Sequence, residues 1–108
     1  MIRVPLIALP DQRLQIILGN QDVTLRVYTR DNRLYTDLGV AGAMVWRGFI
    51  ARNLLPCKFY PYLAFAGQLV FVDMQGLDDP RWEGLGTRWV CMYLTDAEMA
   101  DLFPERNP

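Results

Sequence analysis

The sequence predicts an all-β domain, a small closed or barrel-like antiparallel sheet with one short C-terminal helix. Apolar and polar residues alternate with a period of two in successive stretches, which is typical of strands that bury one face. Short groups of Gly, Asn, Asp and Pro separate these stretches, as hairpin turns require. Because a sheet this apolar needs its edges closed or covered, we expect six to seven strands arranged as a barrel.

The length and composition are those of a single folded domain covering residues 1–108. A chain of 108 residues with 52% hydrophobic content can bury a core. The formal net charge of -1 argues against a nucleic-acid binder driven by positive charge. Five Tyr, five Phe and three Trp exceed what a small core readily hides, so we expect some aromatic rings to contact a partner.

The first strand is expected at residues 2–8 and the second at residues 13–18, which ends in a Gly-Asn turn at 19–20. Pro5 marks the first strand as an edge or a bulge. Together with Pro10 it interrupts the N-terminal apolar run, so the sequence predicts neither a signal peptide nor a membrane span. We therefore expect synthesis and folding in a cytoplasm.

Three further strands are predicted at residues 22–28, 34–40 and 43–51. The turns between them are Asp31-Asn32 and Ala41-Gly42. The last strand carries large apolar groups on both faces, which favours a central strand or one whose outer face contacts another chain. The expected faces are Met44, Trp46, Gly48 and Ile50 on one side, and Val45, Arg47 and Phe49 on the other.

Residues 52–67 are expected to be irregular, because Pro56 and Pro61 disfavour a helix. This stretch gathers four aromatic residues and is a candidate contact surface. They are Phe59, Tyr60, Tyr62 and Phe65.

A short helix is predicted from residue 96 to about residue 103. Thr95 and Glu98 have the spacing of a capping box, and Pro104 marks the stop. We expect its apolar stripe to pack on the sheet, because short helices need tertiary support. The stripe consists of Met99, Leu102 and Phe103. Residues 104–108 are expected to fray.

Before the helix, two strand-like runs within residues 68–94 flank a long acidic loop, residues 73–88. Residues of this loop either fix φ, permit positive φ or bond to their own backbone, so its conformation is specified by its sequence. Ordered long loops often carry function. The residues predicted to hold the loop are Asp73, Gly76, Asp79, Pro80, Gly84, Gly86 and Arg88.

The carboxylates of the acidic loop are the only candidate catalytic or metal-binding group. They are Asp73, Asp78, Asp79 and Glu83. Oxygen ligands could bind a hard cation, and paired carboxylates could transfer protons. Their spacing matches no calcium loop, however, and Arg81 and Arg88 are available as ion-pair partners, so turn chemistry is the favoured interpretation. We predict no metal site and no cofactor.

Two tryptophans of this segment have different predicted roles. Trp89 lies in a strand, where a core position with its indole N–H satisfied is favoured. Trp82 lies inside the loop, where it either pins the loop to the domain or projects as an anchor for a partner. Both alternatives for Trp82 remain open.

The remaining residues offer few candidates for a catalytic, metal or nucleotide site. The chain contains no His, which excludes Ser-His, Cys-His and His-metal sites. Gly84 and Gly86 do not open a helix and form no dinucleotide fingerprint.

Cys57 and Cys91 lack metal-site spacing and are expected as buried free thiols. The basic residues are dispersed, which indicates solvated strand faces rather than a nucleic-acid track. They include Arg3, Arg13, Arg26, Arg30, Arg33, Arg47, Arg52 and Lys58.

Three stretches of the sequence resemble the phage baseplate plug family of contractile-tailed phages. They are MIRVPLIALPDQRLQIILG, VTLRVYTRDNRLYTDL and LVFVDMQGLDDPRWEGLGTRWVCMYL, and they cover most of the chain up to Leu94. The last stretch is the most specific. In it, the residues that stand in the family's order are Asp73, Gly76, Asp79, Pro80, Gly84, Leu85, Gly86 and Arg88.

The resemblance implies a non-enzymatic structural protein at the distal end of the tail tube, assembled in the bacterial host cytoplasm. Hub or spike proteins and the tape-measure protein are the implied partners, with several copies around the tail axis and no nucleic acid or membrane. The expected partner-binding residues are Phe59, Tyr60, Tyr62, Arg81, Trp82 and Glu83. The alternative is a small β-fold module that binds a ligand or peptide through residues 73–88.

Overall fold

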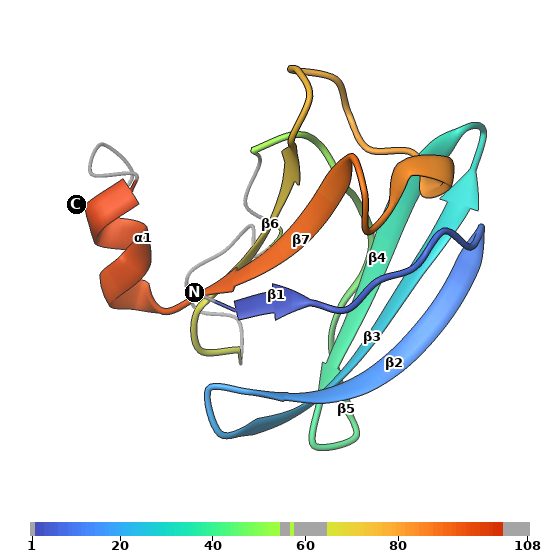
Figure 1. Cartoon of the computed structure of the whole chain (residues 1–108). Coiled ribbons are helices and arrows are strands. Elements are labelled where there is room, and N and C mark those ends of the chain that lie inside the picture. The colour runs from blue at the N-terminus through green and yellow to red at the C-terminus, as the bar shows by residue number, and fades with distance from the viewer. Residues whose placement is uncertain (1, 55–56, 58–64, 103–108) are drawn as a thin grey trace.

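The computed structural model describes residues 2–54, 57 and 65–102, and these form two antiparallel sheets and two short helices (Figure 1). The strands are β1 (Ile2–Val4), β2 (Asp11–Leu18), β3 (Gln21–Arg30), β4 (Arg33–Val40), β5 (Ala43–Ile50), β6 (Gln68–Asp73) and β7 (Trp89–Leu94). The helices are the 3₁₀ helix η1 (Trp82–Gly84) and the α-helix α1 (Asp96–Leu102). The predicted all-β class and strand number are confirmed.

The predicted barrel is wrong, because neither sheet closes. Sheet A has the order β1-β7-β6, and sheet B has the order β2-β3-β4-β5. The expected first strand stops at Val4, where Pro5 follows, and the chain then passes to the other sheet before β2 begins. β1 and β2 are therefore edge strands of different sheets and do not complete one barrel.

Sheet B is a meander whose three turns each contain two residues with positive φ. These are Gly19-Asn20 at 57° and 61°, Asp31-Asn32 at 53° and 64°, and Ala41-Gly42 at 51° and 83°. Two consecutive positive φ values define the type I′ turn, whose twist matches that of the strands it joins. The three predicted turns are confirmed, although β2 and β3 extend beyond the predicted bounds.

The edge strand β5 departs from the predicted alternation because it is bulged. Its register against β4 shifts twice, so that Leu38 pairs with Trp46 but Thr36 pairs with Phe49. Gly48, at a φ of 69°, occupies one irregularity, and its N–H donates to Asp37 Oδ1 at 2.6 Å. Trp46 and Phe49 consequently pack against the same core, although we expected them on opposite faces. In the described part of the chain β5 is an edge strand, so of the two alternatives the central strand is wrong, and contact of its outer face with another chain stays a prediction.

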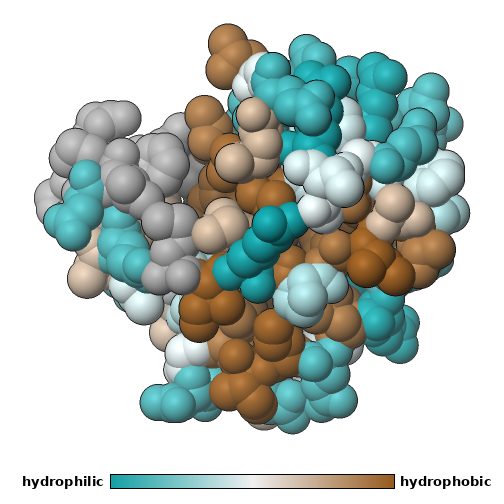
Figure 2. Space-filling view, viewed as in Figure 1, coloured by the Kyte–Doolittle hydropathy of each residue, from teal (hydrophilic) through white to brown (hydrophobic). Residues whose placement is uncertain are grey.

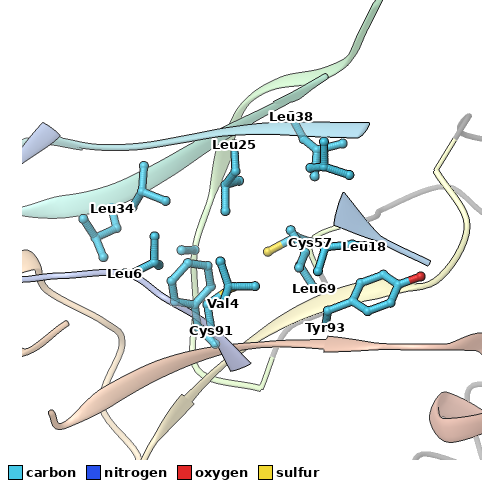
Figure 3. Packing of buried hydrophobic residues seen from close by; sticks show 14 of the residues in the cluster. Val4, Leu6, Leu18, Leu25, Leu34, Leu38, Cys57, Leu69, Cys91 and Tyr93 are labelled. Carbon is cyan, nitrogen blue, oxygen red and sulfur yellow. The ribbon is translucent and has the colours of Figure 1, made fainter. Parts of the chain in front are cut away.

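The core lies between the two sheets (Figure 3). Both sheets supply fully buried side chains, among them Leu25 from β3 and Phe71 from β6. Phe65, expected on a contact surface, is instead buried, with ring centroids 5.8 Å from Trp46 and 5.7 Å from Tyr93. The Phe65 ring packs between Trp46 of sheet B and Tyr93 of sheet A. Because it is buried there, it is not available to a partner.

Both cysteines are buried free thiols, as predicted. Burial raises the pKa of the Cys57 thiol to about 12 and that of Cys91 well above its usual value. The Cys57 N–H donates to the Leu69 carbonyl at 2.8 Å, so this residue lies along the outer edge of β6. Thiols held in this protonated, buried state act as small apolar side chains.

The C-terminal helix begins with the predicted capping box. The Thr95 N–H donates to Glu98 Oε1 at 3.0 Å, and the Glu98 N–H donates to Thr95 Oγ1 at 3.2 Å. Figure 1 shows α1 beyond the end of β7, to one side of the sheets. Met99 is half-buried. Phe103 and the predicted frayed tail, residues 104–108, lie outside the described residues.

The open arrangement leaves apolar side chains at the surface. Figure 2 shows hydrophobic residues gathered over the side on which β1 and β2 lie. Ile2, Ile7, Leu9 and Ile17 are 47%, 59%, 43% and 63% exposed. Within the described residues, no helix is long and apolar enough to cross a bilayer.

Candidate functional site

A bidentate ion pair closes the base of the acidic loop. Asp73 ends β6 and Arg88 directly precedes β7, so the pairing of the two strands brings them together. Arg88 Nε donates to Asp73 Oδ1 and Arg88 Nη2 donates to Oδ2, both at 2.9 Å. The N–H groups of Gln75 and Asp78 donate to the same two oxygens, also at 2.9 Å. Four donors therefore satisfy one buried carboxylate.

The electrostatics of this pair keep both groups charged. Hydrogen bonds from Arg88 hold the pKa of the Asp73 carboxyl well below its usual range, and the backbone donors add to this effect. The hydrogen bond to Asp73 in turn raises the pKa of Arg88. A carboxylate with a lowered pKa is ionised near neutral pH, and its four hydrogen bonds order the loop.

The other aspartates of the loop are also engaged. Asp78 Oδ2 lies 2.9 Å from Arg88 Nη2. Asp79 Oδ1 accepts the Asn53 N–H at 3.1 Å, and its Oδ2 lies 3.3 Å from Arg33 Nη1 at the start of β4. The acidic loop is therefore tied to sheet B by an exposed ion pair. Among the residues that the structure describes, no three Asp, Glu, Cys or His side chains are grouped as metal ligands.

Trp82 of the loop and Trp89 at the start of β7 both pack against the core. Trp89 is 6% exposed, and its Nε1 donates to the Asp78 carbonyl at 3.1 Å. This confirms the predicted core position with a satisfied indole. The Arg88 guanidinium lies 4.5 Å from the centroid of the Trp89 ring. Trp82 is half-buried and packs against the core cluster, which corresponds to the pinning alternative.

Two glycines allow the loop to pack closely. A Cβ at Gly84 would lie 2.5 Å from two ring atoms of Trp89. Gly86 has a φ of 85°, and a Cβ there would lie 2.7 Å from the Leu6 carbonyl oxygen. The Arg3 guanidinium donates to the Gly86 carbonyl, so this end of the loop docks on β1 and the segment that follows it.

Gly76 and Pro80 have different environments. A Cβ at Gly76 would be in ordinary contact with the Asp73 carboxylate, at 3.4 Å. Pro80 is buried.

Pro80 also helps to line an open recess of about 440 Å³ between the loop and the β3–β4 turn. The loop recess is lined by residues 31–33, 78–81, 88–89 and Ala51.

The predicted partner-binding residues are distributed over two parts of the chain. Arg81, Trp82 and Glu83 are consecutive at η1, where Arg81 and Glu83 are exposed and Arg81 reaches the loop recess. Phe59, Tyr60 and Tyr62 lie outside the described residues.

Sequence reasoning missed two residues that organise the site. Asn53 Oδ1 accepts the Asp73 N–H at 2.8 Å, while its own N–H donates to Asp79. A single polar residue in an irregular stretch gives no sequence pattern that could reveal this role. Arg33 adjoins a predicted turn, but its pairing with Asp79, 46 positions away, depends on how the two sheets pack.

Comparisons with curated proteins and with models of protein families give different results. A comparison with curated proteins gives no match. The model of one family, described as cyanophage baseplate Pam3 plug gp18, matches residues 1–96. The match includes all seven strands and the whole acidic loop, and it ends at the first residue of α1. The chain belongs to this baseplate plug family.

Proposed function

We propose that this protein is a plug or adaptor at the distal end of a phage tail tube, where it contacts the hub and tape-measure proteins. The observation that carries the proposal is the family match over residues 1–96, which supports a structural role in the baseplate and a place in the virion tail. The contractile tail type, the neighbours and assembly in the host cytoplasm belong to the proposal.

The described structure is suited to a stiff building block. Four donors hold Asp73 at the base of the acidic loop, and Asp79 connects this loop to sheet B. A surface that is ordered before binding loses less conformational entropy when a partner docks. The family suggests a protein that works by contact and not by catalysis.

The proposed contacts lie at three places in the chain. Arg81 and Glu83 are exposed at η1, with Trp82 packed between them and the core. Phe59, Tyr60 and Tyr62 complete the proposed partner-binding set. Ile7 and Ile17, on the side where β1 and β2 lie, supply exposed apolar area for a further contact. Several copies around the tail axis would make individually weak contacts strong.

Two experiments test this function. The purified protein is first titrated by calorimetry with the hub protein and with the C-terminal segment of the tape-measure protein of the same phage. We expect saturable binding to at least one of them. Electron cryo-microscopy of the virion should then show density for this chain at the distal end of the tube. Absence of that density from intact tails would contradict the proposal.

The loop recess favours a second candidate function, a module that binds a small ligand or peptide. Its volume of about 440 Å³ falls within the range of roughly 300–1,000 Å³ that is usual for ligand pockets. Its walls are largely charged, however, and Asp78, Asp79 and Arg88 already have ionic partners. A thermal-shift screen with small ligands and short peptides, without phage proteins, distinguishes the two functions, because only the second predicts stabilisation there.

A further inference from the structure

Three of the four edges of sheets A and B are short, interrupted or covered. At the outer edge of β6, the Leu54 N–H donates to the Phe71 carbonyl at 2.8 Å, and the Cys57 N–H makes the equivalent bond to Leu69. β1 ends after three residues, before Pro5, and β5 is bulged. Short strands, bulges and covering segments are common ways of preventing an edge from pairing with another chain.

The fourth edge, β2, has none of these features. Its eight residues pair with β3 without a register shift, from Asp11 opposite Tyr28 to Leu18 opposite Gln21. β2 contains no Pro, Gly or Lys, and its charged residues, Asp11 and Arg13, stand at one end. Figure 1 shows β2 at the margin of sheet B, and within the described residues no second strand pairs with it. A long regular edge of this kind is a template for another strand.

The backbone groups of β2 that point away from β3 belong to its odd-numbered residues. Leu18 and Gln21 flank a two-residue turn and therefore form a hydrogen-bonded pair. At the other end of the ladder, the Thr29 N–H donates to the Pro10 carbonyl at 2.8 Å. Bonded and non-bonded pairs alternate along an antiparallel ladder, so the even-numbered residues bond to β3. The outward groups are those of Asp11, Arg13, Gln15 and Ile17.

The inner face of β2 is incompletely covered. Leu14 and Ile16 pack against the core but are only half-buried. Their cross-strand partners on β3, Leu25 and Val23, are fully buried. One more strand beside β2 would cover the remaining apolar area if it carried apolar residues at alternate positions.

We infer that this strand is β2 of a second copy of the chain, paired antiparallel about a two-fold axis centred on Gln15. β2 itself has the required pattern, with apolar residues at 14, 16 and 18 on its inner face. A two-fold contact of this kind occupies both free edges at once and closes the assembly as a dimer. The inference needs only this chain and goes beyond the proposed function.

The side chains of β2 favour this register. Outward backbone groups can bond only where an odd-numbered residue lies opposite another. An axis centred on Arg13 would place like charges directly opposite each other, and one centred on Leu14 would place them on a close diagonal. With the axis at Gln15, Arg13 instead lies opposite Ile17 of the second copy, and Leu14 lies opposite Ile16 on the inner face.

Sedimentation equilibrium and amide hydrogen exchange test the pairing. Between about 10 µM and 1 mM protein, we expect the mean mass to rise from that of one chain toward twice that mass and no further. At high concentration the amides of Arg13, Gln15 and Ile17 should gain protection, whereas those of Leu14 and Ile16 are protected at every concentration. A monomer throughout, masses beyond the dimer, or protection without this alternation would overturn the inference. Protection that needs added hub or tape-measure protein would also overturn it and assign the edge to a strand of that protein.

Matched variants at Gln15 test the role of the backbone. Gln15→Pro removes an outward N–H but none of the bonds to β3, so the fold should persist and self-association should weaken about tenfold. Gln15→Thr loses the same side-chain bond to Asp22 but keeps the N–H, and it should weaken self-association less than about threefold. Equal association of the two variants would contradict pairing through the backbone.

Ile17 tests the register without altering a backbone group or the core, because its side chain is 63% exposed. Ile17→Glu places a carboxylate opposite Arg13 of the second copy and should strengthen association about threefold, whereas Ile17→Lys should weaken it about threefold. The net charge of -1 predicts the reverse order for general repulsion, since Glu adds to this charge and Lys cancels it. The reverse order, or no difference, would therefore exclude the register centred on Gln15.

Discussion

The meander of sheet B and the acidic loop of sheet A differ in what holds them in place. In sheet B, each turn has two consecutive residues with positive φ, and the ladders between strands repeat the same contact many times. In the loop, one buried carboxylate accepts four hydrogen bonds, and single residues of distant segments complete the arrangement. Order in the meander is distributed, whereas order in the loop is concentrated in a few side chains. Substitutions should therefore have unequal effects in the two regions.

The largest expected effect comes from the core that the two regions share. Phe71, on β6, is fully buried, so Phe71→Ala should reduce the free energy of unfolding by about 3–5 kcal/mol. Urea titrations monitored by far-ultraviolet circular dichroism and by tryptophan fluorescence measure this loss. We expect both probes to give one midpoint, because the side chains of both sheets belong to one core.

The exposed residue Leu77 provides the control for this experiment. It is 84% exposed, so Leu77→Ala should change the free energy of unfolding by less than about 0.5 kcal/mol. Separate midpoints for the two probes in Phe71→Ala would show that the meander and the loop region unfold independently. The meander and the loop region would then be two folding units rather than parts of one cooperative domain.

The next effect tests whether the order of the loop is concentrated at Asp73. Its pKa is lowered in the folded state, so its charge stabilises the protein fully above the unfolded pKa of about 4 and less as the pH falls below it. Asp73→Asn removes this contribution. We expect the variant to be less stable than the wild type at pH 7, and the two urea midpoints to approach each other toward about pH 3.

Asp11 is the corresponding carboxylate of sheet B. Its pKa is also lowered, chiefly by its hydrogen bonds with Arg26, but its side chain is 54% exposed. Asp11→Asn should therefore give a pH-dependent loss of the same sign and smaller size, because solvent screens an exposed pair. If Asp73→Asn and Asp11→Asn lose equal amounts of stability, the order of the loop is not concentrated at Asp73.

The contrast between the meander and the acidic loop also explains which features could be predicted from the sequence. The meander was predictable because Asp31-Asn32 and its equivalent turns are local, and each fixes the register of the strands beside it. The sequence also pointed to residues that hold the acidic loop, since Asp73, Gly84, Gly86 and Arg88 lie within the loop or just beside it. Contacts from Arg33 and Asn53 were missed, because they depend on how distant segments pack.

Two predictions about sheets failed for a related reason. Closure of a barrel depends on which edge strands meet, and the chain between Val4 and Asp11 sends β1 and β2 to different sheets. The faces of β5 were misassigned because alternation assumes an unbroken ladder. Gly48 accommodates a bulge that changes which residues face inward, and a single glycine does not specify a bulge in advance.

A further expected difference is between two glycines, one from each region. A Cβ at Gly84 would lie 2.5 Å from two atoms of the buried Trp89 ring, so Gly84→Ala should cost about 2–3 kcal/mol through overpacking. Gly42, in the β4–β5 turn, has a φ of 83°, and a Cβ there would have no atom within 4 Å. Gly42→Ala should therefore cost only about 1 kcal/mol, as backbone strain. Urea titration measures both losses, and the indole N–H resonance of Trp89 should move in Gly84→Ala alone. An unchanged indole resonance together with equal losses would show that the loop tolerates displacement of Trp89, and that its order is as distributed as that of the meander.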